Sequence, residues 1–404
     1  MKNRKFSPLW VFVILMSGSI AFTVYLLIKT SGACLDTIVS GAGNDRYMDF
    51  FNHITYVRDP KNVYFSSEHA CFPPLIYFMY LLFGKMLPQD ATTMYNASLT
   101  SAYALLLYIV YCVILAVLLF YSVHKLAREK SIEWSLGMTM LILLSNAFIF
   151  GVLERGNSVL IVTILLMRAL ELREKDDRIS RERALILIAC SAGIKIYPAV
   201  FGLLYLVEKR WKEAGRLILY GLFFFFAPFA FFGGKEGMIQ FVRNQMTIQA
   251  VGNGIGTVGA FWNLLTETQN GWVAVAGYLI LIVAGCILTK DLWKRVCLLS
   301  SVMVVAPFWS GRYTTIYMVI PLILFFRESG QKVIDYIYAG LFACMFLLIA
   351  YSNTVISDYA HTYLPIVVER MAIYAMNIMV IAGALILSVG RKCRVQTVKG
   401  IKKG

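Results

Sequence analysis

The densest group of side chains able to do chemistry lies early in the chain, in the segment GNDRYMDFFNHITYVRDP. Asp45, Asp49 and His53 follow one another at intervals of four residues, which is about one turn of a helix. A carboxylate that takes a proton from an attacking hydroxyl group is a common general base. We therefore interpret Asp49 and Asp45 as candidate catalytic residues, with His53 tuning the base or orienting an acceptor.

This segment is predicted to form a short amphipathic helix, capped near Asn44 and ended by Pro60. We expect it to lie on the membrane surface, with aromatic side chains in the interface and carboxylates facing a cavity. Partial burial would then raise the pKa of Asp49 toward that of a useful base. For Asp45, a solvated position that complements the helix dipole remains open. The predicted polar side holds Asp45, Asp49, Asn52, His53 and Tyr56, and the opposite side holds Tyr47, Phe50, Phe51, Ile54 and Val57.

Four cations elsewhere in the chain lie at junctions between apolar segments, where an ionisable group is costly and usually marks a substrate path or a partner. They could together bind a phosphate or diphosphate, Arg through forked hydrogen bonds and Lys as a point charge. For any one of them a purely structural role remains open. The cations are Arg155, Lys195, Arg243 and Arg312. Neighbouring polar residues predicted to contact substrate are Tyr197, Asn244, Gln245 and Tyr313.

The composition shows what kind of scaffold must position these residues. The 404 residues are 59% hydrophobic and 15% charged, with a mean hydropathy of +0.68, against roughly 45–50% apolar and about 25% charged in soluble domains. The apolar residues come in blocks long enough to cross a bilayer as helices, for example 9–28, 99–121 and 272–288. The sequence therefore predicts an all-α integral membrane protein.

Basic residues set the predicted topology of about 12 transmembrane helices. Of the 38 Lys and Arg residues, 26 fall in short segments assigned to the cytoplasmic side and 11 in outer segments, with Arg168 at the end of a span. Both termini are then cytoplasmic, and the net charge of +15 needs no nucleic-acid partner. Residues 1–390 form one transmembrane domain, with outer loops at 29–98 and 233–271, and residues 391–404 form a basic tail.

Some of the predicted spans are short or broken. In this topology residues 73–87 must dip into the membrane and return, and residues 184–207 must form a hairpin about Lys195 and Pro198. Broken helices are tolerated at membrane depth where protein or a water-filled cavity satisfies their backbone, so they indicate a cavity that opens outward. One long span at 184–207 is the alternative. Lys29, Lys85 and Arg370 are expected to snorkel at span ends for structural reasons alone.

No motif in the sequence indicates a specific cofactor. The four histidines lack the spacing of metal ligands, HExxH and GxSxG do not occur, and the eight cysteines are scattered without a CxxC pair. We therefore predict no specific metal site and leave a divalent metal open.

Taken in order, several motifs resemble the GT-C membrane glycosyltransferases, and in particular glycosyltransferase family 87. The motifs are NDRYMDFF in the first outer loop, DPxxVY, FPPLIYF, RGN before a span, KIYP and RNQ. The resemblance implies a GT-C fold and an inverting transfer of a sugar, most often mannose, from a polyprenyl-phosphate donor to a lipid or glycan acceptor on the extracytoplasmic side. Asp49 best matches the family's general base, although the loop has no DxD motif.

Two other classes of protein remain open. A transporter or flippase could have the same number of spans, but the sequence shows no twofold repeat and no carboxylate or His in the middle of a predicted span. A lipid-linked polymerase or ligase would also use an outer-loop arginine such as Arg243. Short inner loops and Lys-rich ends suit a bacterial plasma membrane, and an endoplasmic-reticulum enzyme would share the topology.

Overall fold

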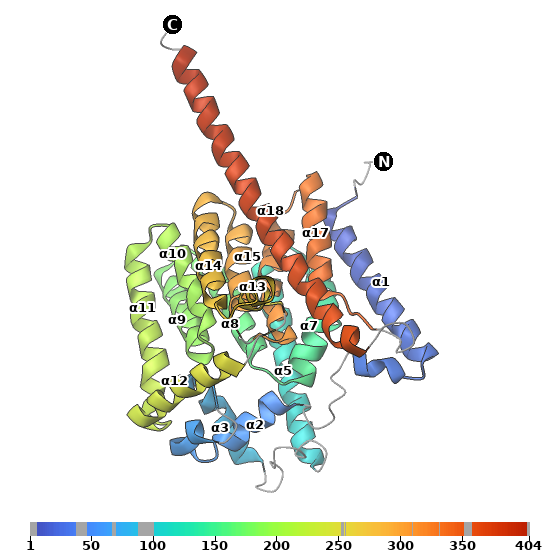
Figure 1. Cartoon of the computed structure of the whole chain (residues 1–404), viewed down its shortest axis with the longest axis vertical. Coiled ribbons are helices and arrows are strands. Elements are labelled where there is room, and N and C mark those ends of the chain that lie inside the picture. The colour runs from blue at the N-terminus through green and yellow to red at the C-terminus, as the bar shows by residue number, and fades with distance from the viewer. Residues whose placement is uncertain are drawn as a thin grey trace.

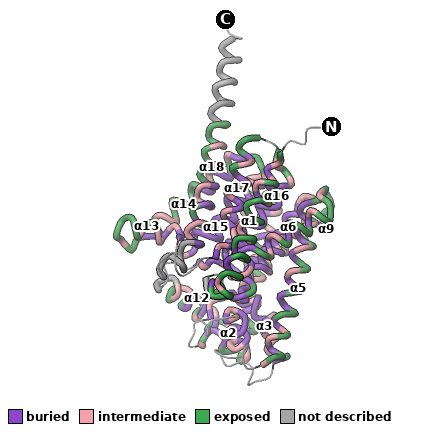
Figure 2. Tube along the Cα trace, turned by 90° about the vertical axis from the view of Figure 1, so that its right-hand side faces the viewer, coloured by how far each residue is buried: buried purple, intermediate pink, exposed green. Residues whose placement is uncertain are grey.

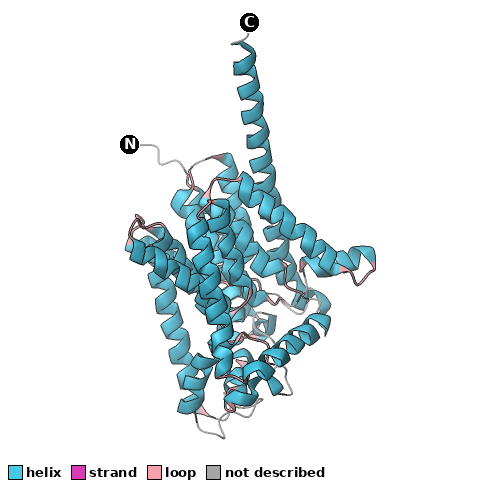
Figure 3. Ribbon diagram, turned by 90° about the vertical axis from the view of Figure 1, so that its left-hand side faces the viewer, coloured by secondary structure: helices cyan, strands magenta, loops and turns pink. Residues whose placement is uncertain are grey.

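The fold is built from helices alone in the part of the chain that the structure describes (Figure 3). Helix makes up 82% of this computed structural model. The described residues are 6–37, 47–66, 70–87, 101–251, 254, 256–308, 310–330, 332–350 and 358–401, without the side chains of 249–251, 358–364 and 389–401. The predicted all-α class is therefore confirmed for these residues.

Five segments among the described residues are long and apolar enough to cross a membrane. A sixth is a pair of helices, Ile132–Leu143 and Asn146–Glu154, bent by 62° at a short break. These helices make the chain a multi-pass membrane protein, whereas the predicted number of 12 spans is not confirmed. The five are α1 (Pro8–Lys29), α5 (Ala102–Ala127), Trp211–Ala230, α14 (Gly271–Leu288), and Pro365–Ser388 within α18 (Asp358–Ile401).

The remaining helices are shorter. Those before residue 160 are η1 (Ala33–Thr37), α2 (Met48–Tyr56), η3 (Pro60–Phe65), η4 (Pro74–Ile76), α3 (Tyr77–Met86), α6 (Ile132–Leu143), α7 (Asn146–Phe148), the π-helical turn η6 (Ile149–Glu154) and α8 (Val159–Arg173). Those after it are α9 (Arg178–Ile194), η7 (Tyr197–Gly202), α10 (Leu203–Val207), α11 (Trp211–Phe226), η8 (Ala227–Ala230), α12 (Gly234–Val251), α13 (Val258–Thr266), α15 (Leu292–Val305), η9 (Arg312–Met318), α16 (Val319–Glu328) and α17 (Val333–Phe346).

Local sequence explains where the long helices start. Ser7 caps α1 and is followed by Pro8, whose missing N–H and fixed φ suit the first turn. Ser101 caps α5 and Ser131 caps α6 in the same way, each accepting a hydrogen bond from a backbone N–H of the first turn. The outer faces of α1 and α5 expose apolar side chains, as expected for helices that face lipid.

Buried residues gather in the interior of the bundle, on short helices such as α15 (Figure 2). Most residues of α8, α15 and α16 are buried. A helix that is apolar and buried on all sides belongs to the interior of a large bundle. These helices are 10 to 15 residues long, so they support the site without meeting the length expected of a full span.

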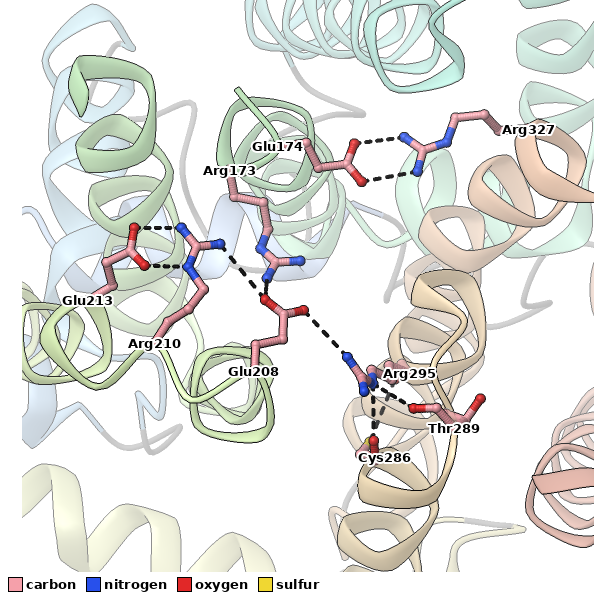
Figure 4. Close-up of polar contacts among 9 residues, drawn as sticks. All are labelled: Arg173, Glu174, Glu208, Arg210, Glu213, Cys286, Thr289, Arg295 and Arg327. Atoms are coloured by element: carbon pink, nitrogen blue, oxygen red, sulfur yellow. Dashed lines mark hydrogen bonds and ion pairs between the residues drawn. The ribbon is translucent and has the colours of Figure 1, made fainter. Parts of the chain in front are cut away.

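Ion pairs connect basic segments at one end of the bundle, which the sequence places on the cytoplasmic side, and Figure 4 shows these pairs. Glu208, after α10, pairs with Arg173 at the end of α8 and lies 3.6 Å from Arg295 of α15. Arg327 of α16 pairs with Glu174 at 3.0 Å. In Figure 1 α1 begins and α18 ends at this same end. The segments are therefore on one side of the bundle, as the charge count predicts.

The predicted hairpin about Lys195 is confirmed. Helix α9 ends at Ile194, and η7 and α10 lead the chain back, so that Lys209 lies in the same hollow as Arg178 at the start of α9. Pro198 lies in the first turn of η7, where it needs no backbone donor. The chain therefore reverses at Lys195, and this reversal places the lysine at the far end of the bundle from the ion pairs.

The two predicted outer loops contain helices of their own. The loop at 29–98 includes α2 and α3, and the loop at 233–271 includes α12 and α13. In Figure 1 α2, α3 and α12 lie together at the end of the molecule opposite the ion pairs. Helix α3 has ten residues, too few to cross a bilayer, which agrees with the prediction that this segment does not span.

The prediction that α2 rests its aromatic side on the membrane is wrong. Phe50, Phe51, Ile54 and Val57 are buried inside the protein, and the ring of Phe50 contacts Tyr80, Tyr108 and other aromatic rings of α3 and α5. The helix also ends at Tyr56, before the predicted Pro60. Amphipathic spacing alone cannot distinguish lipid from a protein partner, and here the partner is the protein's own core.

Candidate active site

Asp49 lies in the first turn of α2, and the backbone of another segment holds that turn. The N–H of Asp49 donates to the carbonyl of Arg155 at 3.0 Å, and the N–H of Tyr47 donates to the carbonyl of Glu154. Tyr47 has the left-handed φ of 61° at the start of the helix. The first-turn N–H groups of a helix have no partner within the helix, so the junction before α8 supplies acceptors and positions Asp49.

The carboxylate of Asp49 receives two further hydrogen bonds from the same junction. Arg155 Nη2 donates to Oδ1 at 2.9 Å and Asn157 Nδ2 donates to Oδ2 at 2.6 Å, while the side chain remains 20% exposed. Arg155 and Asn157 of the RGN motif therefore each donate a hydrogen bond to one carboxylate oxygen of Asp49. Sequence reasoning missed Asn157 as an individual residue, although its motif was already recognised as a feature of the family.

Burial raises the pKa of Asp49, but Arg155, Asn157, Lys195 and His53 together outweigh it and hold that pKa below its ordinary value. The prediction of a raised pKa is therefore wrong. The spacing of apolar residues indicates that Asp49 is partly buried. It does not indicate that Arg155 and Lys195, more than 100 residues away in the sequence, lie close to the carboxylate. Asp49 is ionised at neutral pH, which a proton acceptor requires.

Gly156 allows this close arrangement. Its φ of +70° lies in the left-handed region, and a Cβ at this position would lie 2.7 Å from Cβ of Phe50 and 3.2 Å from the ring of Tyr108. Any other residue would push α2 away from the junction. The glycine of RGN therefore explains how Arg155 and Asn157 can both reach one carboxylate.

His53 follows Asp49 by one turn but is buried, with 6% of its surface exposed. Its Nδ1 is 3.0 Å from the hydroxyl of Tyr77, and its ring stacks on Phe72 at a centroid distance of 3.9 Å. Burial lowers the pKa of His53 to about 3, with Asp49 opposing and Lys195 adding to the shift. The histidine is therefore neutral at physiological pH and is held among aromatic side chains.

Lys195 caps the end of α9 and is nearly buried. Its Nζ lies 3.3 Å from the centroid of the Phe72 ring, a cation–π contact, and it interacts electrostatically with Asp49. Phe72 thus lies between Lys195 and His53, in contact with both. Among the described residues no carboxylate lies within ion-pair distance of this buried ammonium group, so Lys195 is well suited to bind an anion.

A cavity of about 80 Å³ opens beside Lys195. Three residues predicted to contact substrate, Tyr197, Gln245 and Tyr313, line it together with Lys195. Gln245 also donates a hydrogen bond to the carbonyl of Cys71. Ligand pockets commonly enclose roughly 300–1,000 Å³, so the cavity has to widen before a sugar can enter.

The other predicted site residues lie elsewhere. Asn244 is buried, and its amide donates to the carbonyls of Tyr64 at 2.8 Å and Ala70 at 2.9 Å, so it holds the first outer loop. Arg243 is exposed. Arg312 is buried with its guanidinium 4.7 Å from the Phe150 ring centroid, and it is not among the residues that line the cavity. Asp45 lies outside the described residues.

Helix α18 holds the segment that carries Tyr313. Arg370 is fully buried, and its Nη2 donates to the carbonyl of Gly311 at 2.9 Å and to the hydroxyls of Ser310 and Thr314 at 3.2 Å. The prediction that Arg370 snorkels at a span end is therefore wrong. Its preceding residue, Glu369, accepts hydrogen bonds from Asn146 at 2.8 Å and Thr315 at 2.9 Å.

In the described part of the chain, no group of three or more His, Cys, Asp or Glu side chains is arranged to hold a metal ion. The candidate site is instead one carboxylate, several hydrogen-bond donors and a buried lysine next to aromatic rings.

A comparison of the sequence with models of protein families finds a match. The model of glycosyltransferase family 87 matches residues 72–311, more than half of the chain. The chain belongs to glycosyltransferase family 87. No curated protein and no solved structure matches it. Family 87 proteins are GT-C type membrane glycosyltransferases, so the resemblance seen in the motifs is confirmed.

The matched region of this family 87 protein includes Arg155, Asn157 and Lys195 but not Asp49. Asp49 is connected to the matched region through its hydrogen bonds with Arg155 and Asn157. The family match begins after Asp49, but these hydrogen bonds place the carboxylate of Asp49 against the RGN motif of the matched region.

Proposed function

We propose that this protein transfers a sugar, mannose in the first instance, from a polyprenyl-phosphate donor to a hydroxyl group of a lipid or glycan acceptor, with inversion at the anomeric carbon. The observation that carries the proposal is Asp49 held by Arg155 and Asn157, within electrostatic reach of Lys195. A proton acceptor and an anion-binding group are the two functions that such a transfer needs.

The reaction step follows from these two groups. The acceptor oxygen attacks the anomeric carbon from the face opposite the phosphate, a new carbon–oxygen bond forms, and the bond to the phosphate oxygen breaks. The lipid phosphate leaves with that electron pair, and Lys195 stabilises its charge. Asp49 takes the proton of the acceptor hydroxyl. Its lowered pKa makes it a weak base, which suits a proton that is released late, when the attacking oxygen has become acidic.

A second cavity supports a lipid-linked donor. It measures about 460 Å³ and is lined by apolar side chains of α9, η7, α10 and α11. Ile196 lines both this cavity and the one beside Lys195. A polyprenyl chain placed in the apolar cavity would bring its phosphate group to Lys195, so the hairpin about this lysine would bind both parts of the donor.

We further infer a GT-C fold with about 12 spans, both termini in the cytoplasm and the site on the outer side of a cell membrane. Charge supports this orientation, because the ion-paired basic segments and the candidate site occupy opposite ends of the bundle. Family membership favours a transferase over a transporter or flippase.

The experiment that tests this function uses the full chain purified in detergent. It is incubated with labelled polyprenyl-phosphate mannose, glucose or arabinose and a membrane lipid extract, and products are sought by mass spectrometry. We expect a glycosylated acceptor from one of the three donors, mannose first, without a sealed membrane. Absence of any product in detergent, together with donor movement across sealed vesicles, would establish a flippase instead. Consumption of a lipid-diphosphate donor alone would establish a polymerase or ligase.

A further inference from the structure

A hollow lined mainly by cations lies at the end of the molecule opposite the candidate site. It measures about 580 Å³ and is formed where the start of α9 meets the start of α11. Six of the residues that line it are basic and one is acidic. The lining residues are Arg178, Arg181, Lys209, Arg210, Trp211, Lys212, Glu213 and Arg216.

The protein's own carboxylates neutralise this basic hollow only in part. Arg210 pairs with Glu213, and Arg216 pairs with Glu182. The other four cations, Arg178, Arg181, Lys209 and Lys212, have no carboxylate within ion-pair distance among the described residues. The hollow therefore carries an uncompensated positive charge on a concave surface, which is the complement of a compact anion.

An exposed aromatic side chain connects the hollow with the lipid-facing side of α11. Trp211 is 63% exposed and is the first residue of the helix. Further along, Leu219 and Phe223 are exposed apolar residues of the same helix, and neither lines the cavity proposed for the polyprenyl chain. Tryptophan is enriched at the boundary between headgroups and hydrocarbon, so the basic hollow lies at headgroup level and the apolar face of α11 at the level of acyl chains.

We propose that the basic hollow binds the headgroup of an anionic phospholipid, whose acyl chains lie along α11. Basic pockets between transmembrane helices bind anionic headgroups in this way. The apolar face beside Trp211 favours a lipid over a free phosphate ion, because only a lipid gains from both surfaces. The site holds no residue of the candidate active site and is separate from the proposed donor position at Lys195.

Another basic region on the same side of the bundle serves as a matched control. Lys290 and Lys294 line a hollow of about 290 Å³ between α14, α15 and α18. There Asp291 pairs with Lys294, and no tryptophan is among the described residues that line the hollow. Removing two lysines here changes the net charge as much as removing Arg181 and Lys212, without touching the basic hollow.

The test measures phospholipid binding to the full chain in detergent by native mass spectrometry, with phosphatidylglycerol and phosphatidylcholine as probes. We expect phosphatidylglycerol to bind at least tenfold more tightly than phosphatidylcholine. The double variant Arg181→Gln/Lys212→Gln should weaken phosphatidylglycerol binding at least fivefold. Lys290→Gln/Lys294→Gln should bind as the unmodified protein does, and Arg181→Lys/Lys212→Arg, which keeps both charges, should also retain binding.

Three results would overturn the proposal. One is equal binding of the two phospholipids. A second is equal loss in the two Gln double variants, which would indicate a general charge effect. The third concerns a soluble ion: if inorganic phosphate or glycerol phosphate displaced phosphatidylglycerol at equal concentration, the hollow would be a site for soluble anions rather than lipid.

Discussion

Asp49 and His53 are one turn apart on α2, yet their surroundings differ. Asp49 remains partly exposed and is bonded to Arg155 and Asn157, whereas His53 is enclosed by Phe72, Tyr77 and other aromatic rings. One residue is thus kept charged and the other neutral. Two titratable groups with separated pKa values often mark an active site.

The neutral state of His53 predicts how stability depends on pH. Its pKa is about 3 in the folded protein and about 6.5 in an unfolded chain. Between these values the unfolded chain binds more protons, so the free energy of unfolding falls as the pH drops below 6.5. At pH 5 the loss is about 2 kcal/mol. In the variant His53→Gln the melting temperature in detergent should therefore fall less between pH 7.5 and pH 5.

A second histidine provides the control for this measurement. His124 lies on α5, where its Nδ1 is 3.1 Å from the hydroxyl of Ser135, far along the chain from the candidate site. The variant His124→Gln should keep the pH dependence of the unmodified protein. If His53→Gln and the unmodified protein lost the same number of degrees on acidification, His53 would not be the neutral buried group described above.

Residue types and short spacings predicted part of this site. The sequence predicts Asp49 and four further residues of the candidate site. In the structure Asp49 interacts electrostatically with Lys195 and Tyr313. One cavity is lined by Lys195, Tyr197, Gln245 and Tyr313. The pairing of Asp49 with Arg155 and Asn157 was not predictable, because it joins residues more than 100 positions apart. Periodicity describes one element at a time and does not say which element faces it.

At the scale of elements, the turn η6 fixes the position of η9. Gly151 of η6 packs so closely on the other segment that a Cβ there would lie 2.5 Å from Cα of Tyr313. Tyr313 lines the cavity beside Lys195. Helix α18 holds the same segment from another side through Arg370. Two contacts therefore determine where this wall of the cavity lies.

The variant Gly151→Ala should displace that wall. A Cβ that meets backbone cannot be accommodated by a side-chain rotation, so the segments must separate, at a cost of about 1–3 kcal/mol. We expect sugar transfer to fall at least tenfold and the melting temperature to fall by several degrees. Both are measured on the purified protein, the first with the labelled donor and the second by thermal unfolding.

Gly137 of α6 is the matched control, since a Cβ there would meet nothing within 4 Å. Gly137→Ala should keep full activity and an equal or higher melting temperature, because alanine favours the helix by about 1 kcal/mol. Equal effects of the two substitutions would mean that the contact between η6 and Tyr313 does not position the cavity wall.

The hairpin about Lys195 and the surroundings of α2 show which features of whole elements the sequence can and cannot predict. The hairpin about Lys195 was predicted, because a proline and a short apolar segment flanked by cations leave few other topologies. The environment of α2 was predicted wrongly, because its apolar face packs on α3 and α5. Lipid and a protein core select the same residue types, so only the three-dimensional structure separates them.

Across the whole molecule, the ion-paired basic segments and the candidate active site lie at opposite ends of the bundle. Ion pairs join five basic segments at one end, and Asp49, Lys195 and the cavity lie at the other. The count of basic residues predicted this separation from sequence alone. It did not predict the number of full spans, since buried helices such as α15 and α16 are apolar without being long enough to cross.

We propose that Asp49 acts as the general base of this membrane glycosyltransferase, and the variant Asp49→Asn is the decisive test of that role. The purified variant is compared with the unmodified protein and with Glu236→Gln, which removes an exposed carboxylate of α12, using the labelled polyprenyl-phosphate sugar that the unmodified protein accepts. We predict that Asp49→Asn folds normally and transfers sugar at least 100-fold more slowly, while Glu236→Gln keeps full activity. Full transfer activity in Asp49→Asn would contradict the assignment.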